Sequence, residues 1–173
     1  IILIPVRMAS KRFPNKPMAL INGKPMVQRV WEQAMLSNLG EVVVACCEKE
    51  VFNHINALGG KAEMTNPDLP SGTDRIYEAI KNYSNIDQID SIINLQGDMP
   101  IINPKDIGKV NIPLQQGFDI GTLVTELTED HISDVNITKA KIAWIHQYKI
   151  GKAINFFKKD LNFTSNNIFH HVG

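Results

Sequence analysis

The stretch EVVVACC, residues 41–47, contains an uninterrupted apolar run that is rich in β-branched valine. Such a run is typical of a strand that is buried on both faces. A second apolar run, ILIPV, occupies residues 2–6, and between the two the apolar residues of 26–37 recur at helical spacing. A strand, a helix and another buried strand in this order predict a βαβ unit with a parallel sheet.

The same alternation continues on both sides of this unit. Further helices are predicted at 48–58, stopped by Gly59 and Gly60, at 71–83 and at 104–116, and further strands at 61–65, 91–96 and 120–125. After Glu126 the pattern changes to paired strands within 141–157, which we expect to turn at residues 150–152 and to form a mixed edge of the sheet. The sequence therefore predicts one α/β domain over residues 1–173, with a mostly parallel mixed sheet covered on both faces.

Composition excludes several classes of protein. The 18 basic and 18 acidic residues give a formal net charge of +0, which argues against a general nucleic-acid binder. No apolar run reaches the length of a membrane span, and no signal peptide is visible. The adjacent Cys46 and Cys47 make a poor disulfide framework, and no Cys/His cluster has zinc-site spacing. A reduced, cytoplasmic location is expected.

A cationic loop directly follows the first strand. Residues 6–17, VRMASKRFPNKP, contain four cations, Arg7, Lys11, Arg12 and Lys16. The loop is neither a Walker loop nor a dinucleotide-binding glycine motif, but arginine forks and lysine charges bind polyphosphates well. Pro14 and Pro17 would stiffen it. The alternative is a solvated basic loop with scattered surface ion pairs, and spacing alone does not decide between the two.

Two more polar segments follow predicted strands. In QGDMP (96–100), Asp98 is either a Mg²⁺ ligand or a turn aspartate that caps its own backbone. In SGTDR (71–75), hydroxyl and backbone donors at a helix start either bind a nucleotide or form an ordinary N-cap through Thr73 or Asp74. Because ligands of open α/β sheets bind at the carboxyl ends of the strands, we expect these three loops to form one site.

Taken together and in order, three stretches closely resemble the 3-deoxy-manno-octulosonate (KDO) cytidylyltransferases. They are IPVRMASKRFPNKPMALINGKPMVQRV (4–30), MTNPDLPSGTDRIYEA (64–79) and INLQGDMPI (93–101). The resemblance is good to about residue 104, weakens through 135 and returns faintly to 173. It implies a three-layer, Rossmann-like nucleotidyltransferase fold, a homodimer, and Mg²⁺-dependent coupling of CTP to KDO for lipopolysaccharide synthesis, with release of pyrophosphate.

The resemblance also implies roles for individual residues. The triphosphate would be held by Arg7, Ser10, Arg12 and Lys16, and the cytidine by Ser71, Gly72, Thr73 and Arg75. Gln96 would lie between sugar and nucleotide, Asp98 would bind Mg²⁺, and Lys158 and His171 would contact the sugar. Arg7, Lys16 and Asp98 would be the residues closest to the chemistry.

The chain also departs from the resembled family. Cys46-Cys47 stands in place of a usual Thr-Asp pair, Met99 in place of Glu, Lys11 in place of Thr and Lys158 in place of Arg. The resembled enzymes continue past the glycine matched by Gly173 and supply a second metal-binding aspartate there, so we expect a C-terminally incomplete chain. The alternatives to an active KDO enzyme are a non-catalytic remnant that binds nucleotide and a cytidylyltransferase for another acidic sugar, such as sialic acid.

Overall fold

The computed structural model describes residues 1–8, 13–81, 83–84, 86–146, 150–159 and 167–172. Its contacts divide the chain into two compact units, Ile1–Lys109 and Val110–Gly173, and each is described here by itself. The expectation of one domain over residues 1–173 stays a prediction.

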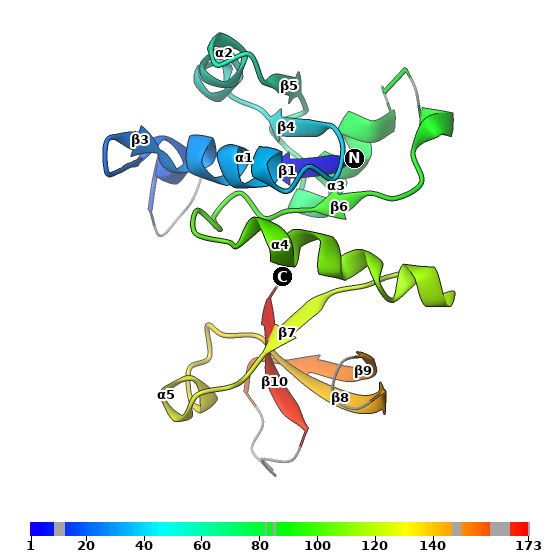
Figure 1. The fold of residues 1–173 in the computed structure, drawn as a ribbon. Helices are drawn as coiled ribbons and strands as arrows, with labels where there is room; N and C mark the ends of the chain where they lie inside the picture. Colours follow the sequence, from blue (N-terminus) through cyan, green and yellow to red (C-terminus); the bar gives the residue numbers. More distant parts are fainter. Residues whose placement is uncertain (9–12, 82, 85, 147–149, 160–166, 173) are drawn as a thin grey trace. The chain divides into compact units, whose positions relative to one another are not determined.

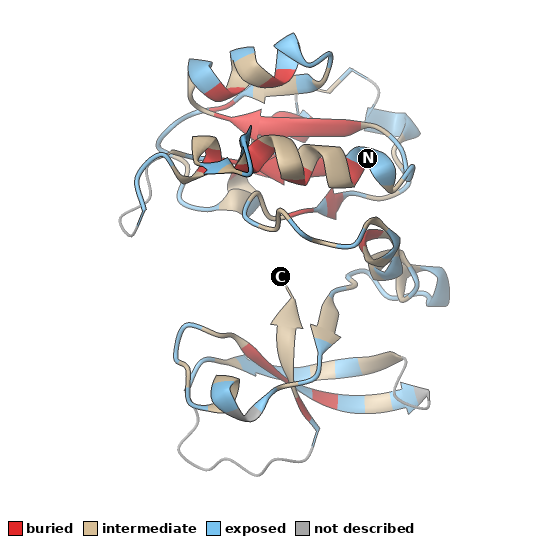
Figure 2. Ribbon diagram, turned by 60° about the vertical axis from the view of Figure 1, so that its left-hand side comes forward, coloured by how far each residue is buried: buried red, intermediate tan, exposed pale blue. Residues whose placement is uncertain are grey.

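A parallel sheet of four strands forms the centre of the first unit. Its strands, in spatial order, are β5 (Lys61–Met64), β4 (Val42–Cys46), β1 (Ile2–Pro5) and β6 (Ile93–Asn94). Strand β4 is buried along its whole length (Figure 2), because β-branched side chains fill the space on both faces of the sheet. The predicted buried strand in 41–47 is therefore confirmed.

Helices cover both faces of this sheet (Figure 1). Helices α1 (Met26–Leu36) and α2 (Lys49–Ala57) share one face, since a Cβ added at Gly60 would touch both Trp31 and Ile55. Helix α3 (Gly72–Lys81) packs on the other face, in a cluster formed by Leu3, Val43, Ala45, Ile76, Ala79 and Ile80. The predicted three-layer α/β arrangement is confirmed for this unit.

The strand order identifies where a ligand would bind. From β1 the chain proceeds outward to β4 and β5, and then α3 carries it back to β6 on the other side of β1. The direction of strand addition thus reverses between β1 and β6. In open α/β sheets, ligands bind at such a reversal, outside the carboxyl ends of the strands.

A short hairpin lies between the cationic loop and α1. Its strands are β2 (Leu20–Ile21) and β3 (Lys24–Pro25), and a 3-10 helix, η1 (Lys16–Met18), precedes them. Asn22 and Gly23 both have positive φ, at 48° and 78°, as a two-residue type I′ turn requires. The Asn-Gly pair predicts this turn, although no hairpin is among the elements expected above.

The predicted helix over 104–116 is wrong as one continuous element. The structure has α4 (Pro104–Ile107), followed by the 3-10 turns η3 (Gly108–Asn111) and η4 (Leu114–Gln116), and another 3-10 turn, η2 (Ile86–Gln88), precedes β6. Gly108 weakens the helical interior, and Pro113 cannot donate a backbone hydrogen bond. The apolar spacing in 104–116 therefore indicated burial but not a regular helix.

The second unit is built on an antiparallel sheet. Its strands, in spatial order, are β7 (Leu123–Thr125), β10 (Ile168–Val172), β8 (Lys139–His146) and β9 (Ile150–Phe157), and α5 (Glu129–Ile132) follows β7. The expected mixed edge of the first sheet is thus wrong, because these strands form a separate sheet. Their pattern explains it: Ala140 and Ile142 are buried whereas Lys141 and Ala143 are exposed, as in a one-faced antiparallel strand.

The expected turn at residues 150–152 is also wrong. These residues belong to β9, and the connection from β8 runs through 147–149, which lie outside the described residues. A Cβ added at Gly151 would collide with Ile142 of the neighbouring strand and approach Trp144. Gly151 therefore permits close cross-strand packing rather than a turn.

Candidate functional site

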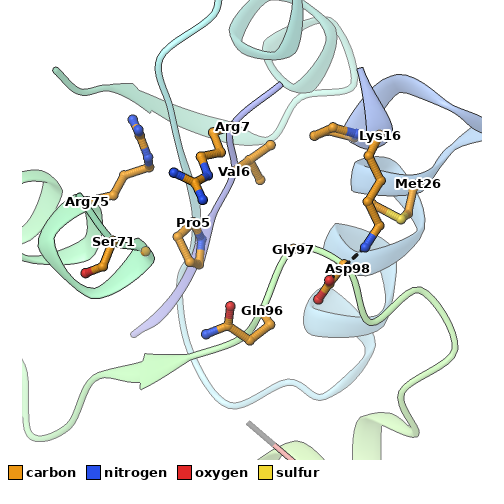
Figure 3. A pocket seen from close by; sticks show the side chains of 12 residues that line it. Pro5, Val6, Arg7, Lys16, Met26, Ser71, Arg75, Gln96, Gly97 and Asp98 are labelled. Atoms are coloured by element: carbon orange, nitrogen blue, oxygen red, sulfur yellow. Dashed lines mark hydrogen bonds and ion pairs between the residues drawn. The ribbon is translucent and has the colours of Figure 1, made fainter. Parts of the chain in front are cut away.

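A pocket of about 280 Å³ lies in the first unit at the carboxyl ends of β1 and β6 (Figure 3). Its lining comprises Pro5, Val6, Arg7, Lys16, Pro17, Met26, Ser71, Gly72, Arg75, Gln96, Gly97 and Asp98. Apart from Pro5 at the end of β1 and Met26 at the start of α1, these residues come from the cationic loop, the SGTDR segment and the QGDMP segment. The expectation that the three loops meet at one place is therefore confirmed, and they meet where the strand order reverses.

Arg7 brings a positive charge to this pocket directly from the end of β1. Its side chain is exposed, and it makes no ion pair or hydrogen bond with any residue that the structure describes. An unpaired guanidinium over a polar pocket is suited to binding an anion through its fork of donors.

Lys16 is held in place by the start of η1. Asn15 precedes it in a left-handed conformation with φ 57°, and the buried Pro17 follows it. The Lys16 ammonium lies 2.7 Å from the Asp98 carboxylate. Lys16 was predicted to bind the triphosphate and Asp98 to bind Mg²⁺, but in this structure the two residues pair with each other. Their side chains are 37% and 54% exposed, so the pair contributes little to stability and a ligand can replace either partner.

Gly97 allows the loop that carries Asp98 to lie against the end of β1. A Cβ added there would lie 2.8 Å from the Pro5 carbonyl oxygen and 3.0 Å from Val6 Cγ2. The backbone at Gly97 does not have a positive φ, so the requirement for glycine is one of space. The close approach therefore fixes where Asp98 enters the pocket.

Replacing Gly97 by alanine is expected to lower the free energy of unfolding by about 1–3 kcal/mol, the usual range for overpacking. The added methyl must displace the β1 backbone, since the carbonyl oxygen of Pro5 cannot rotate away. Urea denaturation of the wild type and the G97A variant measures this difference. Equal stabilities would contradict the close approach.

The SGTDR segment starts α3 next to the pocket. The Ser71 hydroxyl accepts a hydrogen bond from the Asp74 backbone N–H at 3.1 Å and lies 2.5 Å from the Asp74 carboxylate. Ser71 is thus the residue that caps the helix, rather than Thr73 or Asp74. Ser71 and Gly72 line the pocket, whereas Thr73 is exposed and is not among the lining residues, and the role of all three in binding cytidine stays a prediction.

Arg75 reaches the pocket from inside the protein. Its side chain is only 2% exposed, and it donates a hydrogen bond to the Thr65 hydroxyl, which in turn donates to the Cys46 carbonyl at 2.9 Å. Within the described ranges, no carboxylate pairs with this guanidinium. A buried arginine without a counter-ion is costly unless its remaining donors are used, and a ligand in the pocket would use them.

Cys46 and Cys47 are free thiols beside Arg75. Burial, and then the charge of Glu48, raises the pKa of Cys46 to about 12. Burial, and then a hydrogen bond to Glu48, raises the pKa of Cys47 to about 11. The positive charge of Arg75 partly opposes the rise in pKa of both thiols. Both thiols are therefore protonated at neutral pH and unsuited to nucleophilic chemistry.

The part of the chain that the structure describes holds no cluster of three or more His, Cys, Asp or Glu residues suited to a metal.

The remaining predicted residues fall in three groups. Gln96 lines the pocket and donates a hydrogen bond to the Asn94 side chain at 3.1 Å. Ser10 and Arg12 lie outside the described residues. Lys158 and His171 belong to the second unit, so their part in the site stays a prediction.

His171 has defined neighbours within the second unit. Its Nε2 lies 2.9 Å from the Thr122 hydroxyl, and its ring meets the Phe156 ring edge-on at 4.9 Å. Burial, and then the charge of His170, lowers the pKa of His171. The imidazole is therefore largely neutral at physiological pH, with ring nitrogens available for hydrogen bonds rather than for ion pairing.

Two features of this region were not predicted from the sequence. Thr65 follows β5 and holds Arg75, and Glu48 follows β4 and accepts a hydrogen bond from the Met8 N–H at 2.9 Å. Thr65 comes directly after β5 and Glu48 comes two residues after the end of β4, and a polar residue in such a position is the signal that would have found them.

Among the helices in the described ranges, none has the length and apolar character of a membrane span.

The chain is similar to known proteins over its whole length. A family model described as "Cytidylyltransferase" matches residues 1–173. The chain is 42% identical to a 3-deoxy-manno-octulosonate cytidylyltransferase of Paramagnetospirillum magneticum, covering 100% of this chain and 71% of that protein. It is 36% identical to the enzyme of the same name from Rhodospirillum centenum, again over 100% of this chain and 68% of the relative.

A solved structure supports the same likeness. It is described as CMP:2-keto-3-deoxy-manno-octonic acid synthetase complexed with CTP, and it is 32% identical to this chain with a TM-score of 0.85. The match covers 100% of this chain and 71% of that one. A cytidylyltransferase from Leptospira borgpetersenii also matches, at 25% identity and a TM-score of 0.56 over 68% of this chain and 49% of that one.

Proposed function

Because this chain belongs to the cytidylyltransferase family, we propose that it transfers CMP from CTP to KDO and releases pyrophosphate. The resemblance stated from three loops is confirmed by the family match and by the relatives that carry the KDO cytidylyltransferase name. The nucleotidyltransferase fold is confirmed by the structural match.

One observation carries the proposal. The three loops that define the resemblance line a single pocket, which presents the cations Arg7, Lys16 and Arg75 and the carboxylate of Asp98. An excess of positive charge with one carboxylate suits a triphosphate and a metal that bridges to it. A purely structural set of loops would not need two arginines, the exposed Arg7 and the buried Arg75, that have no counter-ion among the described residues.

The reaction makes limited demands on the protein. The oxygen of the sugar's anomeric hydroxyl attacks the α-phosphorus of CTP, the bond from that phosphorus to the β-phosphate oxygen breaks, and the hydroxyl proton is lost to solvent or a base. Negative charge grows on the departing pyrophosphate. Arg7 and Lys16 would stabilise that charge, and Arg75 with Ser71 would orient the nucleoside.

We also propose that the enzyme binds Mg²⁺ through Asp98. Asp98 offers an exposed carboxylate inside the pocket, and Mg²⁺ in such sites takes one or two carboxylates together with phosphate oxygens and waters. When bound, the metal would supply Lewis-acid polarisation of the α-phosphate. Lys16, which neutralises Asp98 in this structure, would then be released to the phosphates.

The family resemblance also suggests how the sugar is bound, in what oligomeric state the enzyme acts and where it acts. Lys158 and His171 would contact the acidic sugar, with Lys158 providing charge but not an arginine fork. The enzyme would act as a homodimer in the cytoplasm, and its product would serve lipopolysaccharide synthesis. The relatives' names support the reaction, and these additional features rest on the family resemblance.

The expected result is that the protein releases pyrophosphate from CTP only when KDO is present. CTP should react well above ATP or GTP, since Ser71 and Arg75 face a small pocket that favours a pyrimidine. A coupled pyrophosphate assay with each nucleotide, and with KDO and sialic acid in turn, measures both preferences.

Each outcome of this assay has a distinct meaning. Turnover with sialic acid but not KDO would assign the chain to another acidic sugar. CTP binding in calorimetry without turnover on either sugar would contradict transfer activity and favour a nucleotide-binding remnant. Equal binding of all nucleotides would contradict base recognition by the SGTDR segment.

A further inference from the structure

Glu48 occupies the N-cap position, directly before α2, but its side chain does not cap the helix. It lies directly after β4 and Cys47, with φ −113° and ψ 132°, and its side chain makes no hydrogen bond to the helix that it precedes. Ser, Thr, Asp and Asn are the residues that stabilise a helix from this position. The Glu48 side chain therefore makes no capping bond to α2, and its position needs another explanation.

The Glu48 side chain instead reaches the loop that follows β1. Its Oε1 accepts a hydrogen bond from the Met8 backbone N–H at 2.9 Å, across 40 residues of sequence. The Met8 carbonyl accepts a hydrogen bond from the Asn15 N–H at 3.1 Å. The main chain at Met8 is thus held through both its N–H and its carbonyl group, and the second of these bonds joins residues 8 and 15 of the cationic loop.

The second carboxylate oxygen of Glu48 supports a positional role. Oε2 is buried and has no hydrogen-bond partner among the residues that the structure describes. A buried, unsatisfied carboxylate oxygen destabilises the fold, whereas an apolar residue there would not. This oxygen therefore adds no stability, and the contact that Glu48 makes with the cationic loop is the hydrogen bond from Met8.

The residues next to Met8 connect this bond to the pocket. Arg7 precedes Met8 and lines the pocket, and Lys16 follows Asn15 and lines the opposite part. A shift of the main chain at Met8 would move the Arg7 side chain relative to Lys16 and Asp98. A displacement of about 1 Å at a charged site is sufficient to weaken phosphate binding severely.

We propose that Glu48 is a positioning residue for the nucleotide site, which holds the main chain at Met8 so that Arg7 points to the triphosphate of CTP. The proposal rests on the function proposed above. Glu48 is the first carboxylate after β4.

The test compares substitutions of Glu48 in the full chain. E48A removes the acceptor, E48D keeps the charge but withdraws the oxygen from Met8, and E48Q keeps an oxygen of the same reach. We expect E48A and E48D to raise the KM for CTP, and the calorimetric Kd, about tenfold, with kcat and the KM for KDO little changed. E48Q should restore both values to within about threefold of the wild type.

A matched control is available on the same helix. Glu50 is exposed in the first turn of α2 and lies outside the pocket lining, so E50A should leave the CTP parameters unchanged. Thermal unfolding of each variant separates positioning from stability. E48D keeps the test decisive if E48A does not yield folded protein.

The outcomes also separate this proposal from the function on which it rests. If the wild type binds CTP but does not transfer CMP, the proposed function fails while the Glu48 variants still test positioning through calorimetry. Unchanged CTP affinity in both E48A and E48D would overturn the proposal. A failure of E48Q to restore affinity would overturn it too, as would a loss of CTP affinity that follows the loss of Tm in every variant.

Discussion

Replacement of Asp98 by asparagine is expected to lower KDO-dependent pyrophosphate release by about a hundredfold or more. Asp98 is the pocket's carboxylate, and asparagine removes the charge that a Mg²⁺ ion would require at this position. Lewis-acid assistance by a bound metal contributes several kcal/mol to such reactions. The rate with saturating CTP and KDO over a range of Mg²⁺ concentrations measures the effect.

The fold should tolerate this change. The Asp98 side chain is 54% exposed, and its pairing with Lys16 is of the surface kind that contributes little to stability. D68N is a matched control, because Asp68 is an exposed aspartate outside the pocket lining and should retain full activity. A D98N enzyme with unchanged rate and unchanged Mg²⁺ dependence would show that Asp98 is not a metal ligand.

Replacement of Arg7 by alanine is expected to weaken CTP binding by about 1.5–3 kcal/mol, which is roughly tenfold to a hundredfold or more. The Arg7 guanidinium is exposed over the pocket and has no partner among the described residues, so its donors are available to the triphosphate. Isothermal titration with CTP at low and moderate salt measures the loss.

Two comparisons give this prediction its specificity. R7K keeps the charge but loses the fork of donors, and it should fall between the wild type and R7A. The affinity of the wild type should decrease with salt more steeply than that of R7A, because one charge contact is gone. CTP binding that is unchanged in R7A would mean that the cationic loop is a solvated surface loop.

The local pattern of the sequence predicted most of the first unit. The apolar run in 41–47 became β4, the helical spacing in 26–37 became α1, and Gly59 and Gly60 end α2 as expected, with φ 79° at Gly59. These predictions succeed because they depend on residues close together in the chain. Burial on both faces of a strand is visible as a continuous apolar run.

Predictions failed where the partner of an element was decisive. Strands β8 and β9 were expected at the edge of the first sheet, but they pair with each other in a separate sheet, where β8 also pairs with β10. Periodicity shows that a segment is extended, and it contains no information about which strand will be its neighbour. The alternation of lysine and apolar residues over 139–142 was the sign, available in the sequence, of a one-faced antiparallel strand.

The sequence by itself determined the chemistry that this protein can offer: a cationic loop, a helix start rich in donors and a carboxylate, each in a segment that follows a strand. Their common location also followed, since parallel strands place their carboxyl ends at one edge. Only the tertiary structure decided which of these groups meet. Lys16 pairs with Asp98 across 82 residues, Thr65 holds Arg75, and Glu48 holds Met8.

The physical reason is the short range of these interactions. A hydrogen bond or an ion pair forms only when two atoms come within about 3–4 Å, and that distance depends on the packing of entire helices and strands. Sequence patterns predicted most elements of the first unit and the end of its sheet at which the polar residues lie. The register of β1 against β4 and the close approach at Gly97 determine which atoms then lie within reach of one another.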